Sequence, residues 1–114
     1  MSSGLRVLVA DDDVSDLLVI KRLLRDTPYA VDTVRSASQA LDALGKRGYA
    51  AVVVDEERLA DMPGAALLAQ VERLQPRARR ILLAAPERAR ALVEAAQAGR
   101  YQLIARPFRI RFQR

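Results

Sequence analysis

Cysteine and histidine are absent from the 114-residue sequence, and only 4% of its residues are aromatic. Without cysteine the chain can form neither a disulfide nor a thiolate metal site. Without histidine it lacks the most common general base and zinc ligand, and it cannot itself be phosphorylated on histidine. The sequence also contains no apolar stretch of about 18 residues and no basic leader followed by one, so we expect a soluble, cytoplasmic protein without a membrane partner.

Hydrophobic residues make up 51% of the chain. Because aromatic residues are scarce, the core must consist of Leu, Val, Ala and Ile, which suits helices packed against a sheet. At this length we expect one domain with a single core, spanning residues 1–107. Residues 108–114 alternate apolar residues with arginines, a period of two that does not suit a helix. We therefore predict a truncated final element or a tail there, and we favour truncation.

Positive and negative charges are distributed unevenly. Residues 1–70 carry 8 Lys or Arg and 11 Asp or Glu, whereas residues 71–114 carry 11 Arg and 3 Glu. The arginines could form a basic patch for self-association or for an acidic partner, or simply a solvated surface. Nucleic acid is the less favoured partner, because there are few aromatic residues to stack on bases and no helix with polar residues suited to base contacts.

Short apolar runs alternate with helical patterns along the chain. Continuous apolar runs are typical of strands buried on both faces of a parallel sheet, whereas alternation indicates an edge strand. We predict buried strands over 6–10, 50–54, 80–85 and 101–105, and an edge strand over 30–34. We predict helices from Val14, from the capping box at Ser36–Gln39, around Leu67–Leu74 and over 87–99. This order predicts a doubly wound α/β fold with right-handed crossovers.

Acidic residues follow two of the predicted buried strands, the first and the third strand of the chain. Asp11, Asp12 and Asp13 come directly after the first, and Asp55 comes directly after residues 50–54. Functional groups of such folds gather at the carboxyl ends of the strands, so we expect at least three of these carboxylates to lie together. An oxygen-rich cluster suits a hard cation such as Mg²⁺, and an aspartate beside the metal can attack a phosphoryl group.

Each of these residues also has a purely structural interpretation. Aspartates ahead of a helix can cap its first turn and interact favourably with its dipole. Glu56 and Glu57 can serve only to solvate a loop, and Arg106 can be a salt-bridge partner of Asp55. Because Asp55 ends a second apolar strand, we favour a functional site over capping alone.

Four stretches of the chain resemble the receiver domains of bacterial two-component response regulators: VLVADDD, YAAVVVDEERLADMPG, RRILLAA and YQLIARPF. The resemblance implies a five-stranded parallel sheet of flavodoxin-like order 2-1-3-4-5 with helices on both faces, the last helix being short or missing here. It implies Asp55 as the phosphoacceptor, and a Mg²⁺ site formed by Asp11, Asp12, Asp55 and the backbone carbonyl of Glu57. It further implies a signalling role without enzyme activity, apart from self-phosphorylation with a partner phosphodonor.

The same resemblance implies partners. A histidine kinase or a phosphotransfer protein would supply the phosphoryl group, and an output domain or partner protein would receive the signal. The fourth helix and the fifth strand form the surface that we expect for a homodimer.

Three positions depart from the receiver pattern. The Thr or Ser whose hydroxyl contacts the phosphoryl group is Ala84, the lysine before proline is Arg106, and the switch aromatic is Leu103. Arginine keeps the positive charge on a planar fork, so we expect Arg106 to contact phosphate or to form a salt bridge. Without the hydroxyl we expect phosphorylation at Asp55 to be poorly coupled to output. The alternative function is a pseudo-receiver, a constitutive protein-interaction module without phosphorylation-dependent switching.

Overall fold

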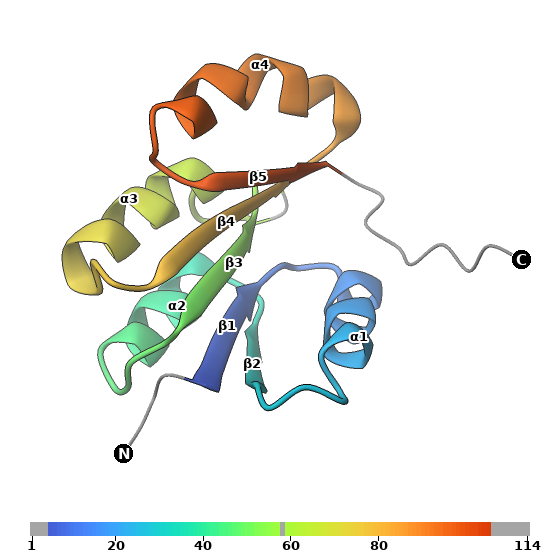
Figure 1. Cartoon of the computed structure of the whole chain (residues 1–114), viewed down its shortest axis with the longest axis vertical. Coiled ribbons are helices and arrows are strands. Elements are labelled where there is room, and N and C mark those ends of the chain that lie inside the picture. Colours follow the sequence, from blue (N-terminus) through green and yellow to red (C-terminus); the bar gives the residue numbers. More distant parts are fainter. Residues whose placement is uncertain (1–4, 58, 106–114) are drawn as a thin grey trace, which may run out of the picture.

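The computed structural model describes residues 5–57 and 59–105. Strands and helices alternate along these residues (Figure 1). In order they are β1 (Arg6–Ala10), α1 (Val14–Leu23), β2 (Ala30–Val34), α2 (Ala37–Leu44), β3 (Ala51–Asp55), α3 (Gly64–Leu74), β4 (Arg79–Ala84), α4 (Pro86–Gln97) and β5 (Gln102–Ala105). The predicted last helix, short or missing, and the tail over 108–114 lie outside the described residues.

The five strands form one parallel sheet in the order β2-β1-β3-β4-β5. This confirms the predicted fold class and strand order, including the prediction that residues 30–34 form an edge strand. β1 and β3 lie side by side, with Ala10 opposite Val54. The acidic residues that follow these two strands therefore emerge next to each other.

The prediction for residues 101–105 was wrong in one respect, because we expected a strand buried on both faces. β5 is the second edge of the sheet, and three of its four residues are exposed. Ile104 is 42% exposed. An edge strand has a neighbour on one side only, and its continuous apolar run gives no sign of that position.

The sheet separates two apolar cores. On one face, alternate residues of β1 and β3, such as Leu8 and Val52, pack with the buried sides of α2 and α3 and with the partly buried side of α4. On the other face, Val7 and Val53 pack with Leu17 and Ile20 of α1. Figure 1 shows α1 on the opposite side of the sheet from α2 and α3. Side chains alternate across a strand, so a continuous apolar run can supply both cores.

None of the helices in the described part of the chain has the length and hydrophobicity that crossing a bilayer requires.

Candidate functional site

Two carboxylates are buried at the carboxyl edge of the sheet. Asp11 directly follows β1 and is 0% exposed, and Asp55 ends β3 and is 2% exposed. Burying carboxylates so close together is unfavourable unless hydrogen bonds or a cation stabilise them. Asp55 Oδ1 accepts a hydrogen bond from the Glu57 N–H (2.7 Å), and Asp11 Oδ1 accepts one from the Asp13 N–H (2.9 Å). Each strand therefore ends in a tight turn that orients its carboxylate.

A third carboxylate joins these two. Oxygen atoms of Asp11, Asp16 and Asp55 all lie within 4.8 Å of one another. Asp16 belongs to the first turn of α1, and side chains of a helix lean toward its N-terminus, which here points at the end of β1. The donors are carboxylate oxygens only, so they fit a hard divalent cation such as Mg²⁺.

The three adjacent aspartates have three different environments. Asp11 turns into the buried cluster, whereas the Asp13 side chain caps α1 by accepting a hydrogen bond from the Ser15 N–H (2.8 Å). The side chain of Asp12 is 52% exposed, and its Oδ1 lies 3.1 Å from Arg35 Nη2. The capping interpretation thus holds for Asp13, and the structure does not bring the Asp12 carboxylate into the cluster.

The predicted ligand role of Asp12 stays a prediction, and sequence reasoning missed Asp16. The available signal was its position three residues after the N-cap Asp13, within the first helical turn, from which a carboxylate can reach back toward the strand end.

Glycine at position 64 lets α3 begin close to Asp55. A Cβ atom there would lie 2.3 Å from the Asp55 carbonyl oxygen, which is too close for any side chain. The Gly64 N–H donates to the Glu56 carbonyl (3.1 Å), and the Glu56 N–H donates to the Leu83 carbonyl (2.8 Å). The segment after Asp55 is therefore held to both α3 and β4.

An arginine from α4 holds the two glutamates that follow Asp55. Arg88 Nη2 lies 2.7 Å from Glu56 Oε2, Arg88 Nε donates to the same carboxylate, and Nε lies 3.5 Å from Glu57 Oε2. The hydrogen bond to Glu56 raises the pKa of Arg88. Sequence reasoning treated these glutamates as loop solvation. The signal that was missed is one of charge: Glu56 and Glu57 are negative, and Arg88 in the first turn of α4, the helix that follows the neighbouring strand β4, is positive.

The model of the response regulator receiver domain matches residues 7–112 of the chain. The chain belongs to this family. Receiver domains are signal-transduction modules of two-component systems and are generally not enzymes. As a family they bind Mg²⁺ at an acidic pocket and interact with histidine kinases or phosphotransfer proteins and with output domains.

Longer regulatory proteins are among its relatives. The transcriptional regulatory protein ZraR of Escherichia coli O157:H7 is 32% identical over 101 residues, covering 89% of this chain and 23% of that protein. The sensory/regulatory protein RpfC of Xanthomonas campestris pv. campestris is 34% identical over 108 residues, covering 91% of this chain and 15% of that protein. The chain thus spans less than a quarter of the length of these relatives.

Solved receiver structures are also similar. The signal receiver domain of an HD domain-containing protein from Pseudomonas fluorescens Pf-5 has a TM-score of 0.81 at 27% identity, covering 94% of this chain and 79% of that one. A response regulator from Burkholderia pseudomallei, with a phosphorylated aspartic acid, calcium ion and citrate, has a TM-score of 0.74 at 28% identity, covering 90% of this chain and 59% of that one.

One of the substituted switch positions of this receiver, Ala84, lies on the strand next to the one that ends in Asp55. Ala84 ends β4, is 2% exposed and follows Leu83, which is opposite Asp55 in the sheet. Its methyl group offers no hydrogen bond. Leu103 lies in β5 opposite Leu82 and is partly buried against the larger core. Arg106 lies outside the described residues, and its predicted role stays a prediction.

The aromatic residue near this position is Tyr101, just before β5. It is 8% exposed and belongs to the same core as Leu103. Burial, and then the negative charge of Glu56, raise the pKa of its hydroxyl. The aromatic ring is therefore already inside the core in this structure.

Proposed function

We propose that this receiver accepts a phosphoryl group on Asp55 from a histidine kinase or a phosphotransfer protein and passes the signal on through protein contacts. The observation that carries the proposal is the cluster of Asp11, Asp16 and Asp55 oxygens at the carboxyl edge of the sheet. Three carboxylates this close repel one another, and a divalent cation would relieve the repulsion. Its family membership supports the same function.

Asp55 is the nucleophile in this proposal. A carboxylate oxygen attacks phosphorus, the bond between phosphorus and the donor's imidazole nitrogen breaks, and the imidazole leaves with that electron pair. An acyl phosphate then remains on Asp55. The hydrogen bond from the Glu57 N–H to Asp55 Oδ1 orients the carboxylate for this attack. Bound Mg²⁺ would neutralise charge on both reactants.

The proposed metal site combines sequence prediction and geometry. Asp11, Asp55 and the backbone carbonyl of Glu57 are the ligands that both the receiver pattern and the strand ends favour. We infer that Asp16 contributes the third carboxylate, because its oxygen lies within the 4.8 Å cluster. Asp12 would then act mainly through its ion pair with Arg35.

The surface of α4 and β5 is the proposed output and homodimer face. No residue of α4 is fully buried, and Val93 and Ile104 are 39% and 42% exposed. Exposed apolar residues on adjacent elements suit a protein contact. Arg88 is already paired with Glu56, so Arg90 is the α4 arginine better placed to serve this face.

A pseudo-receiver is the second candidate function, and Ala84 favours it. A buried methyl group at the end of β4 cannot hydrogen-bond a phosphoryl oxygen, so the part of the domain beyond the pocket would keep one arrangement whether or not Asp55 is modified.

Incubation with acetyl phosphate and Mg²⁺, followed by intact-mass spectrometry, tests the phosphoacceptor role of Asp55. A regulated receiver gains the mass of one phosphoryl group, Asp55→Asn gains none, and the control Asp61→Asn, at another carboxylate of the same loop, still gains one. If the unmodified chain gains no mass, the phosphoacceptor proposal fails and the constitutive module replaces it.

A further inference from the structure

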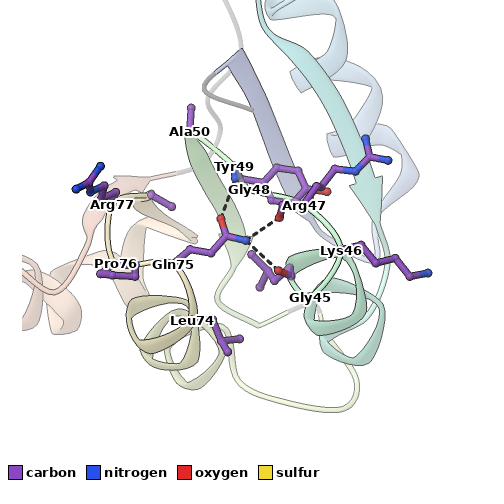
Figure 2. Close-up of a pocket in the computed structure, with 12 residues that line it drawn as sticks. Gly45, Lys46, Arg47, Gly48, Tyr49, Ala50, Leu74, Gln75, Pro76 and Arg77 are labelled. Carbon is purple, nitrogen blue, oxygen red and sulfur yellow. Dashed lines mark hydrogen bonds between the residues drawn. The ribbon is translucent and has the colours of Figure 1, made fainter. Parts of the chain in front are cut away.

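A groove lies at the opposite end of the sheet from the acidic cluster. It is formed by the loop before β3 (44–50) and the segment before β4 (74–78), and its volume is about 790 Å³. Figure 2 shows the Gln75 side chain reaching from the second segment to the first, with Arg77 on one side and Lys46 on the other. The receiver function proposed above makes no use of this end of the sheet.

The groove has a fixed frame. The Tyr49 N–H donates to Gln75 Oε1 (2.8 Å), and Gln75 Nε2 donates to the carbonyls of Leu44 (3.0 Å) and Arg47 (2.7 Å) (Figure 2). One side chain thus joins the end of α3 to the loop before β3. Walls that are held in place before binding lose less conformational entropy when a ligand binds.

The groove is positively charged. Its lining includes Lys46, Arg47 and Arg77 and no carboxylate. Within the described residues Arg77 has no acidic partner. Lys46 pairs with Asp42 where both side chains are about 70% exposed, and Arg47 lies 3.8 Å from Asp32. Exposed or long ion pairs contribute roughly 0–1 kcal/mol, so an incoming carboxylate can replace them easily.

More arginines extend the positive charge along this edge. Arg79 and Arg80 begin β4, and Arg100 precedes β5. The Arg79 guanidinium donates to the Gln102 side chain, and the Arg80 guanidinium donates to the carbonyls of Arg100 and Ala78, so these contacts are to neutral groups. With Arg77, four of the eleven arginines of residues 71–114 therefore lie at the end of the sheet farthest from the acidic cluster.

The backbone of the groove favours one class of ligand. A compact phosphate is typically bound by converging backbone N–H groups, but here the N–H groups of Tyr49, Ala50 and Ala78 already donate to other groups. Recognition falls instead to three separate cationic side chains and to Leu74, which is 52% exposed at the rim. Cations that come from two different segments suit carboxylates distributed along a chain, with an apolar residue among them.

We propose that the groove between residues 44–50 and 74–78 is a docking site for an extended acidic segment of a partner protein. The site lies at the opposite end of the strands from Asp55, so binding there does not depend on phosphorylation. It would allow the receiver to hold a partner while the acidic pocket remains accessible to a phosphodonor.

The test uses the full chain and a fluorescein-labelled peptide of four Glu-Leu repeats, with anisotropy measured at low salt. The double variant Lys46→Glu with Arg77→Glu should weaken binding at least about tenfold, which corresponds to about 1.4 kcal/mol. The control, Lys21→Glu with Arg25→Glu, makes the same change in net charge on exposed residues outside the groove, and it should change affinity less than about twofold. A Gln-Leu peptide of the same length should not bind.

A readout on the unmodified chain keeps the proposal testable if the groove variant fails to fold. Titration with the Glu-Leu peptide should shift the amide signals of residues 44–50 and 74–78. Equal weakening in both double variants, shifts confined to other regions, or no binding by the unmodified chain would each overturn the proposal. Displacement of the peptide by inorganic pyrophosphate at lower concentration than by unlabelled peptide would overturn it in favour of a phosphate ligand.

Discussion

Arg88 and Glu56 join the first turn of α4 to the residue that follows Asp55, with Nη2 and Oε2 only 2.7 Å apart. The Glu56 side chain is only 11% exposed, whereas that of Arg88 is 45% exposed, so it is the carboxylate of this pair that is shielded from water. Shielding from water strengthens the attraction between two opposite charges. It also raises the cost of removing one partner, because the remaining charge is then left without a counter-charge. The position of α4 is therefore tied to the loop after β3 even without a modification at Asp55.

Arg88→Ala should loosen α4 and the residues after Asp55. Removal of the guanidinium leaves the Glu56 carboxylate without its ion-pair partner, so amide exchange in α4 and in residues 56–57 should accelerate and Tm should fall. Hydrogen exchange followed by mass spectrometry measures this. Arg90→Ala removes an exposed arginine of the same helix and should change neither quantity. Equal effects of the two variants would mean that the ion pair has no anchoring role.

The methyl group of Ala84 should confine the effect of a phosphoryl analogue to the pocket. A hydrogen bond to a charged phosphoryl oxygen contributes roughly 1.5 to 3 kcal/mol, enough to shift a two-state population by about one to two orders of magnitude. Beryllofluoride should therefore shift amide signals near Asp55 in the unmodified domain, and shifts should spread to α4 and β5 in Ala84→Thr. Large shifts in α4 and β5 without the substitution would contradict this expectation.

Asp16→Asn and Asp12→Asn should differ in their response to Mg²⁺. The Asp16 carboxylate lies in the cluster with Asp11 and Asp55, whereas that of Asp12 pairs with Arg35. At a Mg²⁺ concentration ten times its Kd the unmodified domain should gain about 1.4 kcal/mol of stability. Thermal unfolding with and without Mg²⁺ should show this gain reduced in Asp16→Asn and largely kept in Asp12→Asn. If the gain were instead reduced in Asp12→Asn and kept in Asp16→Asn, Asp12 rather than Asp16 would be the metal ligand.

Asp61 should make the stability of α2 depend on pH. Its carboxylate accepts hydrogen bonds from the N–H groups of Ala37 (2.9 Å) and Ser38 (2.9 Å), and these bonds hold its pKa below the ordinary value of 3.8. A lowered folded-state pKa means that the stabilisation is fully present above the unfolded value and is lost as pH falls through the folded value. The Tm difference between the unmodified domain and Asp61→Ala should therefore shrink below about pH 4.

Ser36→Ala is the matched control for this pH dependence. The Ser36 hydroxyl caps the same helix by accepting from the Gln39 N–H (3.0 Å), but it does not ionise. Its removal should lower stability by about 0.5–2 kcal/mol at every pH. If the effect of Asp61→Ala were equally constant with pH, the carboxylate charge would have no part in capping.

The order of the elements and the edge at which the site forms could both be predicted from the sequence. Apolar runs and helical periodicity are local properties, and the parallel arrangement then brings the ends of β1 and β3 together, so Asp11 and Asp55 could be predicted as neighbours. The edge position of residues 30–34 followed from their alternating pattern. The apolar pattern of residues 101–105 did not indicate the exposure of β5, because exposure depends on what lies beside the strand and over its face.

The side chains that complete the site depend on contacts between elements that are distant in the sequence. Asp12 turns away because Arg35, beyond the end of β2, pairs with it, and Asp16 turns in because α1 begins close to the buried end of β1. The contacts of Arg88 with Glu56 and of Asp61 with α2 likewise join residues more than twenty positions apart. Such contacts depend on how whole helices and strands are placed relative to one another. A local sequence pattern specifies a helix or a strand, but it does not specify which side chain of a different element will contact it.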